Sequence, residues 1–194
     1  MKVCRCREHE VSGSGVDPLP AELRDKPLKD RRLCEVFSGV ESAKEAGAML
    51  SRVWEAAGGH AERFDIRIDE RMDFLSPEAH EWKQKHCEDP YDVYHFAIPC
   101  TNFSIAKTSP EKVRSLENPY GDETNEEVVY FNKLARAVCY FAVALMTKGA
   151  VVIFEHPLMS YLFFLLEYSC MLGFDGFEVV RSDHRQDGAP YQKP

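Results

Sequence analysis

The stretch Gly149-Ala-Val-Val-Ile-Phe-Glu-His-Pro157 decides the fold class, because it places a short apolar run between a glycine and a Glu-His-Pro turn. Such a run is typical of a strand that is buried on both faces of a parallel sheet. We therefore expect a strand over Ala150–Phe154. The residues before it, Glu126–Thr147, have the apolar spacing of a long amphipathic helix, and Pro157–Leu172 predicts a second helix that ends at Gly173.

The same alternation of strands and helices extends toward both ends of the chain. Apolar runs predict further strands over Leu33–Phe37, His60–Ile66, Met72–Leu75, Asp92–Ile98 and Phe177–Arg181. Helical spacing covers Ser42–Ala57, and Ser76-Pro77-Glu78 has the capping residues that open another helix. This alternation predicts an α/β fold with a mostly parallel sheet and helices on both faces.

Length and composition indicate one domain with an N-terminal tail. The chain has 194 residues and a hydrophobic fraction of 44%, which suits one domain. Residues 1–32 repeat Gly, Ser and Pro without an apolar period, so we expect a flexible tail there and a catalytic domain over residues 33–194. We see neither a membrane span nor a secretory signal, and we expect an intracellular protein, nuclear if its source is eukaryotic.

Charge and cysteine content limit the possible partners. The formal net charge of −8 argues against a general nucleic-acid binder, since such binding depends on neutralising phosphates. Seven cysteines without a regular framework indicate reduced thiols. The cluster of Cys4, Cys6 and His9 is too small for a tetrahedral site, so we expect no metal.

Polar residues follow the predicted strands at their carboxyl ends, where parallel sheets bind ligands. The turn Phe37-Ser38-Gly39 follows the first strand, and its glycine would let a ligand approach backbone amides. Asp65 follows the second strand and can accept hydrogen bonds from a ribose diol. Asp73, in the third apolar run, could accept from an adenine amine.

Two further strand ends carry groups suited to covalent chemistry. Cys100 stands on a polar loop, which is the position of a thiolate nucleophile. Glu155 follows the most apolar strand and could stay protonated to donate to a ring nitrogen. The alternatives are a structural thiol at Cys100 and an ordinary helix N-terminal acid at Glu155.

Residues 33–193 resemble the DNA cytosine-5 methyltransferases in the order of their motifs. Five segments carry the resemblance: the start of the cofactor motif, two cofactor carboxylates, the Pro-Cys motif, the Glu-Asn-Val motif and the Gly-Val-Pro-Gln segment. They are, in that order, Phe37-Ser38-Gly39, Asp65 with Asp73, Pro99-Cys100 with Phe103-Ser104, Phe154-Glu155-His156-Pro157, and Asp187-Gly188-Ala189-Pro190-Tyr191-Gln192-Lys193.

The resemblance implies a Rossmann-like class I methyltransferase fold, S-adenosyl-L-methionine as cofactor, and DNA, or alternatively RNA, as partner. It implies that Cys100 adds to C6 of cytosine while Glu155 hydrogen-bonds N3. The cofactor-binding residues would be Phe37, Ser38, Gly39, Asp65, Asp73 and Pro99, and the nucleic-acid contacts would be Ser104, Lys107, Lys112 and Arg114. The family's C-terminal recognition region is absent from the sequence.

Other readings of these residues stay open. One is a catalytically inactive methyltransferase-like module that binds nucleic acid or protein. Another is an unrelated Cys-dependent enzyme, in which His95 or His156 would pair with Cys100. The basic loop also contains Glu111 and Glu117, so it could simply be a solvated loop.

Overall fold

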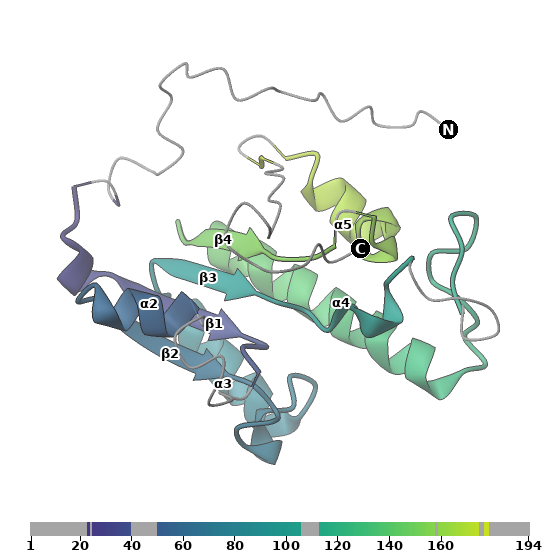
Figure 1. Ribbon diagram of the computed structural model, residues 1–194, viewed down its shortest axis with the longest axis horizontal. Helices are drawn as coiled ribbons and strands as arrows, with labels where there is room; N and C mark the ends of the chain where they lie inside the picture. The colour runs from purple at the N-terminus through teal and green to yellow at the C-terminus, as the bar shows by residue number, and fades with distance from the viewer. Residues whose placement is uncertain are drawn as a thin grey trace, which may run out of the picture.

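Four parallel strands form the centre of the structure, in the order β2-β1-β3-β4 (Figure 1). They are β1 (Arg32–Val36), β2 (His60–Phe64), β3 (Val93–Phe96) and β4 (Val151–Phe154). The computed structural model describes residues 23, 25–39, 50–105, 113–157, 159–174 and 177–178. Within these residues it is an α/β fold, as the sequence predicts, with an all-parallel sheet.

Helices cover both faces of this sheet. They are α2 (Leu50–Ala56), α3 (Pro77–Glu88), α4 (Glu126–Met146) and α5 (Leu166–Met171), with 3-10 turns η1 (Leu28–Asp30), η2 (Glu70–Met72), η3 (Cys100–Asn102) and η4 (Tyr161–Phe164). The hydroxyl of Ser76 accepts from the N–H of Ala79 at 3.0 Å, which confirms the predicted start of α3. The Asn125 side chain caps α4 in the same way.

The core lies between the sheet and the pair α3 and α4. Phe141 of α4 packs edge-on against Phe74, Tyr94 and Phe96, with ring centroids 5.9 to 6.2 Å apart. Rings at this spacing add to the hydrophobic gain from their burial. The opposite face of the sheet carries Glu35 and is covered by α2, whose Ser51 N–H donates to the Glu35 carboxylate at 3.0 Å.

The apolar length of α4 bears on the expected absence of a membrane span. It is the one helix among the described residues whose length and composition would suit a span, with a mean hydropathy of 1.4 over the 18-residue window. Half of that window is buried inside the fold. Core helices of other proteins meet the same criterion, so α4 is weak evidence for a membrane.

Two predicted elements are wrong, because side-chain hydrogen bonds favour turns there. Met72–Leu75 is no strand: Asp69 caps η2, and Asp73 accepts from the N–H of Leu75 at 3.0 Å. The predicted helix Pro157–Leu172 is split into η4 and α5. Leu165, at φ −65° and ψ 140°, is extended between them.

The ends of other predicted elements are only partly described. β1 begins at Arg32, and Lys26 donates to the Asp92 carboxylate at 2.7 Å, so part of the range predicted as a tail contacts the sheet. α2 is the described part of the predicted helix Ser42–Ala57. Of Phe177–Arg181, residues 177–178 are described and form no strand, while the other three lie outside the described residues.

Candidate functional site

The first residues beyond the four strands lie side by side at the carboxyl edge of the sheet. The N–H groups of Phe37, Ala97 and Glu155 each donate to a carbonyl of the neighbouring strand, at 2.8, 3.1 and 3.0 Å. Asp65 follows β2 beside Phe37, so the row runs Asp65, Phe37, Ala97, Glu155. Neighbours in such a row are about 4.8 Å apart. Cys100 comes three residues after Ala97.

The strand order places a topological switch point in the middle of this row. β2 lies on one side of β1 and β3 on the other, so the chain changes direction across the sheet at β1. All four arrows point the same way (Figure 1). In sheets of this kind, ligands bind outside the carboxyl ends of the strands at such a switch point. The turn after β1 and the loop that carries Cys100 flank it.

The turn after β1 is conformationally strained. Phe37 has φ 63° and is the one non-glycine residue with positive φ among the described residues, and Gly39 follows at φ 73°. The Asp65 carboxylate, only 6% exposed, accepts from the N–H groups of Gly39 and Arg67, both at 2.7 Å. Strain of this kind concentrates at ligand sites. A Cβ built on Gly39 would meet no atom of the described residues within 4 Å.

The loop after β3 exposes its cysteine. Pro99 is exposed and extended, and Cys100 then begins η3. The Cys100 thiol is exposed, whereas Cys34 in β1 is buried and desolvation raises the pKa of its thiol. Among these two cysteines, Cys100 is the one that a substrate could reach.

The Cys100 loop is joined to the segment that follows Glu155. Ser104 and Ser160 form an antiparallel bridge, and the N–H of Tyr161 donates to the carbonyl of Phe103 at 2.8 Å. The hydroxyl of Ser160 donates to the same carbonyl at 3.3 Å. The candidate nucleophile and the candidate acid therefore stand on two loops with a shared backbone contact.

Two histidines flank Glu155, and each has a buried nitrogen without a hydrogen-bond partner. His95 Nε2 lies 3.5 Å from Glu155 Oε2, while its Nδ1 has no partner. His156 packs between the rings of Phe103 and Phe163, at 6.2 and 5.9 Å, and neither of its nitrogens has a partner. Burial lowers the pKa of His156 to about 4, so its ring is neutral at pH 7.

Asp73 is not in the row. Its Oδ1 accepts from the hydroxyl of Tyr130 in α4 at 3.2 Å and from the N–H of Leu75. The neighbouring Phe74 ring packs against Phe37 at 5.5 Å. Asp73 therefore does not follow a strand; it contacts α4, and its neighbour Phe74 packs against the β1 turn.

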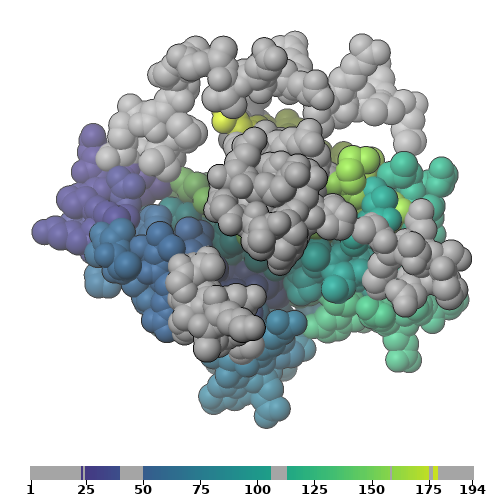
Figure 2. Space-filling model, viewed as in Figure 1, coloured from purple at the N-terminus to yellow at the C-terminus, as the bar shows by residue number. Residues whose placement is uncertain are grey.

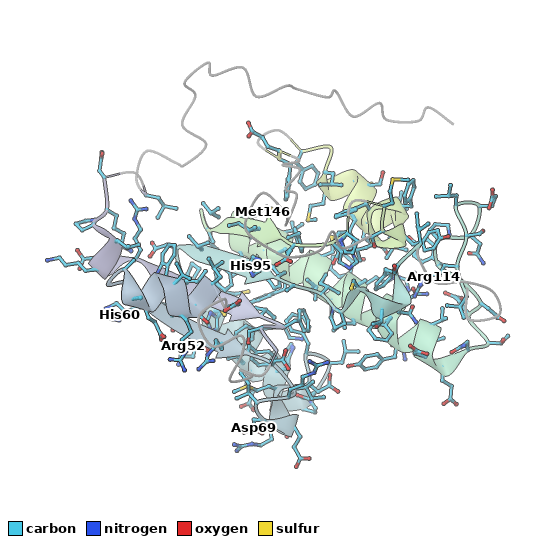
Figure 3. All side chains as sticks on the ribbon, in the orientation of Figure 1. Arg52, His60, Asp69, His95, Arg114 and Met146 are labelled. Atoms are coloured by element: carbon cyan, nitrogen blue, oxygen red, sulfur yellow. The ribbon has the colours of Figure 1, made fainter. Side chains whose placement is uncertain are left out.

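Arg114 is a structural cation, which corrects the prediction that it contacts a phosphate. It is 3% exposed and donates to Asn102 Oδ1 at 2.9 Å, to the Pro119 carbonyl at 2.8 Å and to Asn132 Oδ1 at 2.8 Å. Its guanidinium lies 4.3 Å from the Phe103 ring centroid, and burial lowers its pKa to about 10. Figure 3 shows it away from His95, beside α4.

Several predicted positions lie outside the described residues. Lys107 and Lys112 are among them, as are Cys4, Cys6 and His9. Across the part of the chain that is described, no cluster of three or more His, Cys, Asp or Glu side chains could hold a metal.

Two open hollows of about 600 and 610 Å³ lie beside the first half of α4 and the loop that precedes it. Tyr130 and Lys133 line one, Tyr120 and Arg136 line the other, and neither is lined by Cys100 or Glu155. Both hollows are wide open, whereas a small-molecule site encloses most of its ligand. We therefore place the candidate site on the strand-end chemistry and not on these hollows.

The sequence reasoning missed Glu35 and treated His95 as a structural strand residue. Glu35 is 5% exposed and interrupts an otherwise apolar strand. A charged residue within a buried run was the available signal, because such a residue needs a partner.

Comparison with protein-family models, with curated proteins and with solved structures found no match to this chain. The argument about function therefore rests on the residues at the carboxyl edge and on their geometry.

Proposed function

We propose that this chain is an S-adenosylmethionine-dependent methyltransferase that acts on C5 of cytosine in DNA through a covalent bond to Cys100. The observation that carries the proposal is the row at the carboxyl edge. In this row the strained β1 turn, Asp65, the loop that leads to Cys100, and Glu155 all follow strands at the same edge of the sheet, which is what the motif resemblance requires. On this proposal the four strands are the central part of a Rossmann-like class I methyltransferase sheet.

The β1 turn and Asp65 suit the cofactor. A carboxylate has about four acceptor sites, and Asp65 uses two of them for the N–H groups of Gly39 and Arg67. The remaining two could accept from a ribose diol. The backbone at Gly39, where a Cβ would meet none of the described residues within 4 Å, would approach the rest of the ligand. The motif resemblance adds Ser38 and Pro99 to the cofactor contacts. The cofactor supplies an electrophilic methyl group.

Cys100 and Glu155 would act on the base. The Cys100 sulfur forms a bond to C6 while Glu155 donates a hydrogen bond to N3, so that the electron pair of the C5–C6 bond becomes available at C5. C5 would take the methyl group that the cofactor supplies, with S-adenosylhomocysteine as the leaving group. A base would then remove the C5 proton, so that the C5–C6 double bond re-forms as the S–C6 bond breaks. The target base must first leave the helix stack, at a cost of roughly a few kcal/mol.

One alternative keeps the same site without turnover. The chain carries a net charge of −8, and Arg114, one of the expected phosphate contacts, is buried. Both observations favour a methyltransferase-like module that binds its ligand but does not methylate DNA. The Cys–His enzyme has less support, since the two nitrogens of His95 face Glu35 and Glu155.

Calorimetric titration of S-adenosylmethionine and S-adenosylhomocysteine tests the cofactor site first. We expect micromolar to sub-millimolar binding that Asp65→Ala weakens at least tenfold, about 1.4 kcal/mol. Asp89→Ala, an exposed carboxylate at the opposite edge, is the matched control and should bind like the wild type. Absence of binding at millimolar ligand would overturn the proposal.

Transfer of a labelled methyl group to duplex DNA then separates the enzyme from the inactive module. We expect transfer by the wild type and none by Cys100→Ala. DNA that carries 5-fluorocytosine should retain a covalent adduct with the wild type, because C5 then has no proton to lose. Cofactor binding without transfer or adduct would select the inactive module.

A further inference from the structure

We propose that His95 is a positioning residue that holds the carboxyl group of Glu155, and that the buried carboxylate of Glu35 holds His95 in turn. The inference rests on the proposed function, in which Glu155 donates to the target base. It adds two residues that the motif resemblance does not include.

The strand register places the three side chains on one face of the sheet. Glu35 of β1 is the Cα partner of His95 in β3, and His95 is the partner of Ile153 in β4. Glu155 comes two residues after Ile153 and so returns to the same side. Figure 3 shows His95 near the centre of the molecule.

The distances make the imidazole a bridge between two carboxylates. Nε2 lies 3.5 Å from Glu155 Oε2, and Nδ1 lies 4.0 Å from Glu35 Oε1. The side chains of Glu35 and His95 are 7% and 10% exposed, whereas that of Glu155 is 57% exposed. The bridge therefore leads from the interior of the sheet to the candidate site.

The inner end of the bridge is fixed. Glu35 Oε2 accepts from the N–H of Ser51, in the first turn of the described part of α2, at 3.0 Å. With one oxygen held there, the other faces His95.

The buried Nδ1 of His95 has no hydrogen-bond partner, because Glu35 Oε1 at 4.0 Å is beyond hydrogen-bond distance, so Glu35 acts on His95 through its charge. A second His–Glu pair shows what a satisfied arrangement looks like in the same molecule. His86 Nδ1 contacts the Tyr94 hydroxyl at 2.7 Å and its Nε2 lies 3.6 Å from Glu62. That pair is part of the core packing on the opposite face, while the His95 pair ends at the carboxyl edge.

A fixed carboxyl plane matters because catalysis depends on geometry. A misplacement of about 1 Å can cost about 100-fold in rate. We therefore expect His95→Leu to lower kcat for methyl transfer about 100-fold, with the KM for S-adenosylmethionine unchanged. His95→Gln keeps an amide near the position of Nε2 and should recover about tenfold of the loss. The midpoints of urea unfolding control for loss of structure.

Nitrogen-15 NMR of the imidazole tests the bridge without any need for activity. We expect Glu35→Gln to shift mainly the Nδ1 resonance of His95 and Glu155→Gln mainly the Nε2 resonance. His95→Gln assigns these signals. Glu62→Gln is the matched control and should shift His86 alone.

Either of two results would overturn the inference: His95 resonances that neither variant moves, or an unchanged kcat in His95→Leu. If the wild type transfers no methyl group, the proposed function fails and the positioning role fails with it. In that case the NMR comparison still decides whether Glu35, His95 and Glu155 are in contact.

Discussion

The two edges of the sheet differ in how completely their polar groups are paired. At the amino edge, Arg32 donates to Asp89 at 2.8 and 2.9 Å and lies 4.7 Å from the Tyr91 ring centroid. Asp92 accepts from Lys26 and from the N–H of Arg32, both at 2.7 Å. The contacts of Asp92 join residues up to 66 positions apart in the sequence and link the segment before β1 to the start of β3.

At the carboxyl edge, Phe37 is strained, Cys100 is exposed, and His95 and His156 have unpaired buried nitrogens. The other unpaired buried side-chain atoms of the described residues belong to α2. Figure 2 shows the purple start of the described chain on the left and the teal and green residues of α4 and the loop before it on the right. Stability is concentrated at one edge and unsatisfied groups at the other, as expected of a scaffold that carries a site.

The largest expected effect tests the carboxyl edge through pH. Burial lowers the pKa of His156 from 6.5 to about 4. Below pH 6.5 the unfolded chain binds a proton that the folded chain does not, so stability falls from pH 6.5 to pH 4 and levels off below. The loss is about 3 kcal/mol. Urea unfolding between pH 6.5 and pH 4 measures this loss, and His156→Phe should remove the pH dependence. If the His156→Phe variant still loses stability over this range, another group is the cause.

The next effect tests the amino edge by mutation. Asp92→Ala removes the acceptor of Lys26 and of the Arg32 N–H, and we expect a loss of about 2 kcal/mol in unfolding free energy. Asp89→Ala is the control, since this carboxylate is exposed and its ion pair should contribute nothing measurable. If Asp92→Ala and Asp89→Ala lower the unfolding free energy equally in chemical denaturation, Asp92 contributes no more to stability than the exposed Asp89.

A second pH range belongs to the core beside the amino edge. Hydrogen bonds from His86, Trp82 and Tyr91 lower the pKa of Glu62 from 4.5 to about 2. The stability this provides is complete above pH 4.5 and is lost as the pH falls toward 2. Because the side chain is 36% exposed, we expect about 1 to 2 kcal/mol after solvent screening. Glu62→Gln should flatten the unfolding curve in this range and leave the range of His156 unchanged.

The smallest expected effect is at two glycines that both have a positive φ. Gly39 at the carboxyl edge and Gly58 before β2 have φ 73° and 94°, and a Cβ at either would meet no atom of the described residues within 4 Å. Alanine at each should therefore cost about 1 kcal/mol of conformational strain. Gly39→Ala should also weaken S-adenosylmethionine binding, whereas Gly58→Ala should not. If calorimetry finds the same affinity for S-adenosylmethionine in Gly39→Ala and Gly58→Ala, the β1 turn is not part of the cofactor site.

The sheet could be predicted from the sequence because its signals are local. Apolar runs bounded by glycine or proline identified β1, β2, β3 and β4 within two residues, and Ser76 identified the start of α3. The errors arose where short polar side chains bond to nearby backbone, as Asp69 and Ser160 do. Such bonds change a strand or a helix into a turn without changing its apolar content.

The candidate site was harder to predict, because it depends on cross-strand register. The sequence indicated Asp65, Cys100 and Glu155 from their places after strands. It could not show that Glu35 meets His95, since that contact joins residues 60 positions apart. Arg114 was misjudged for the same reason: charge in a loop predicts exposure, and only the fold shows that Asn102 and Asn132 bury it.

The contact of Arg114 with Asn102 also has a consequence for the length of the chain between them. It joins the two ends of the stretch between Ile105 and Val113 at one point of the scaffold. Because the two ends of this stretch are held together, the free energy of unfolding depends only weakly on the length of the stretch. Doubling the length of a loop costs about 0.6 kcal/mol. A change in the number of residues at this place would therefore leave the row of strand-end residues as it is.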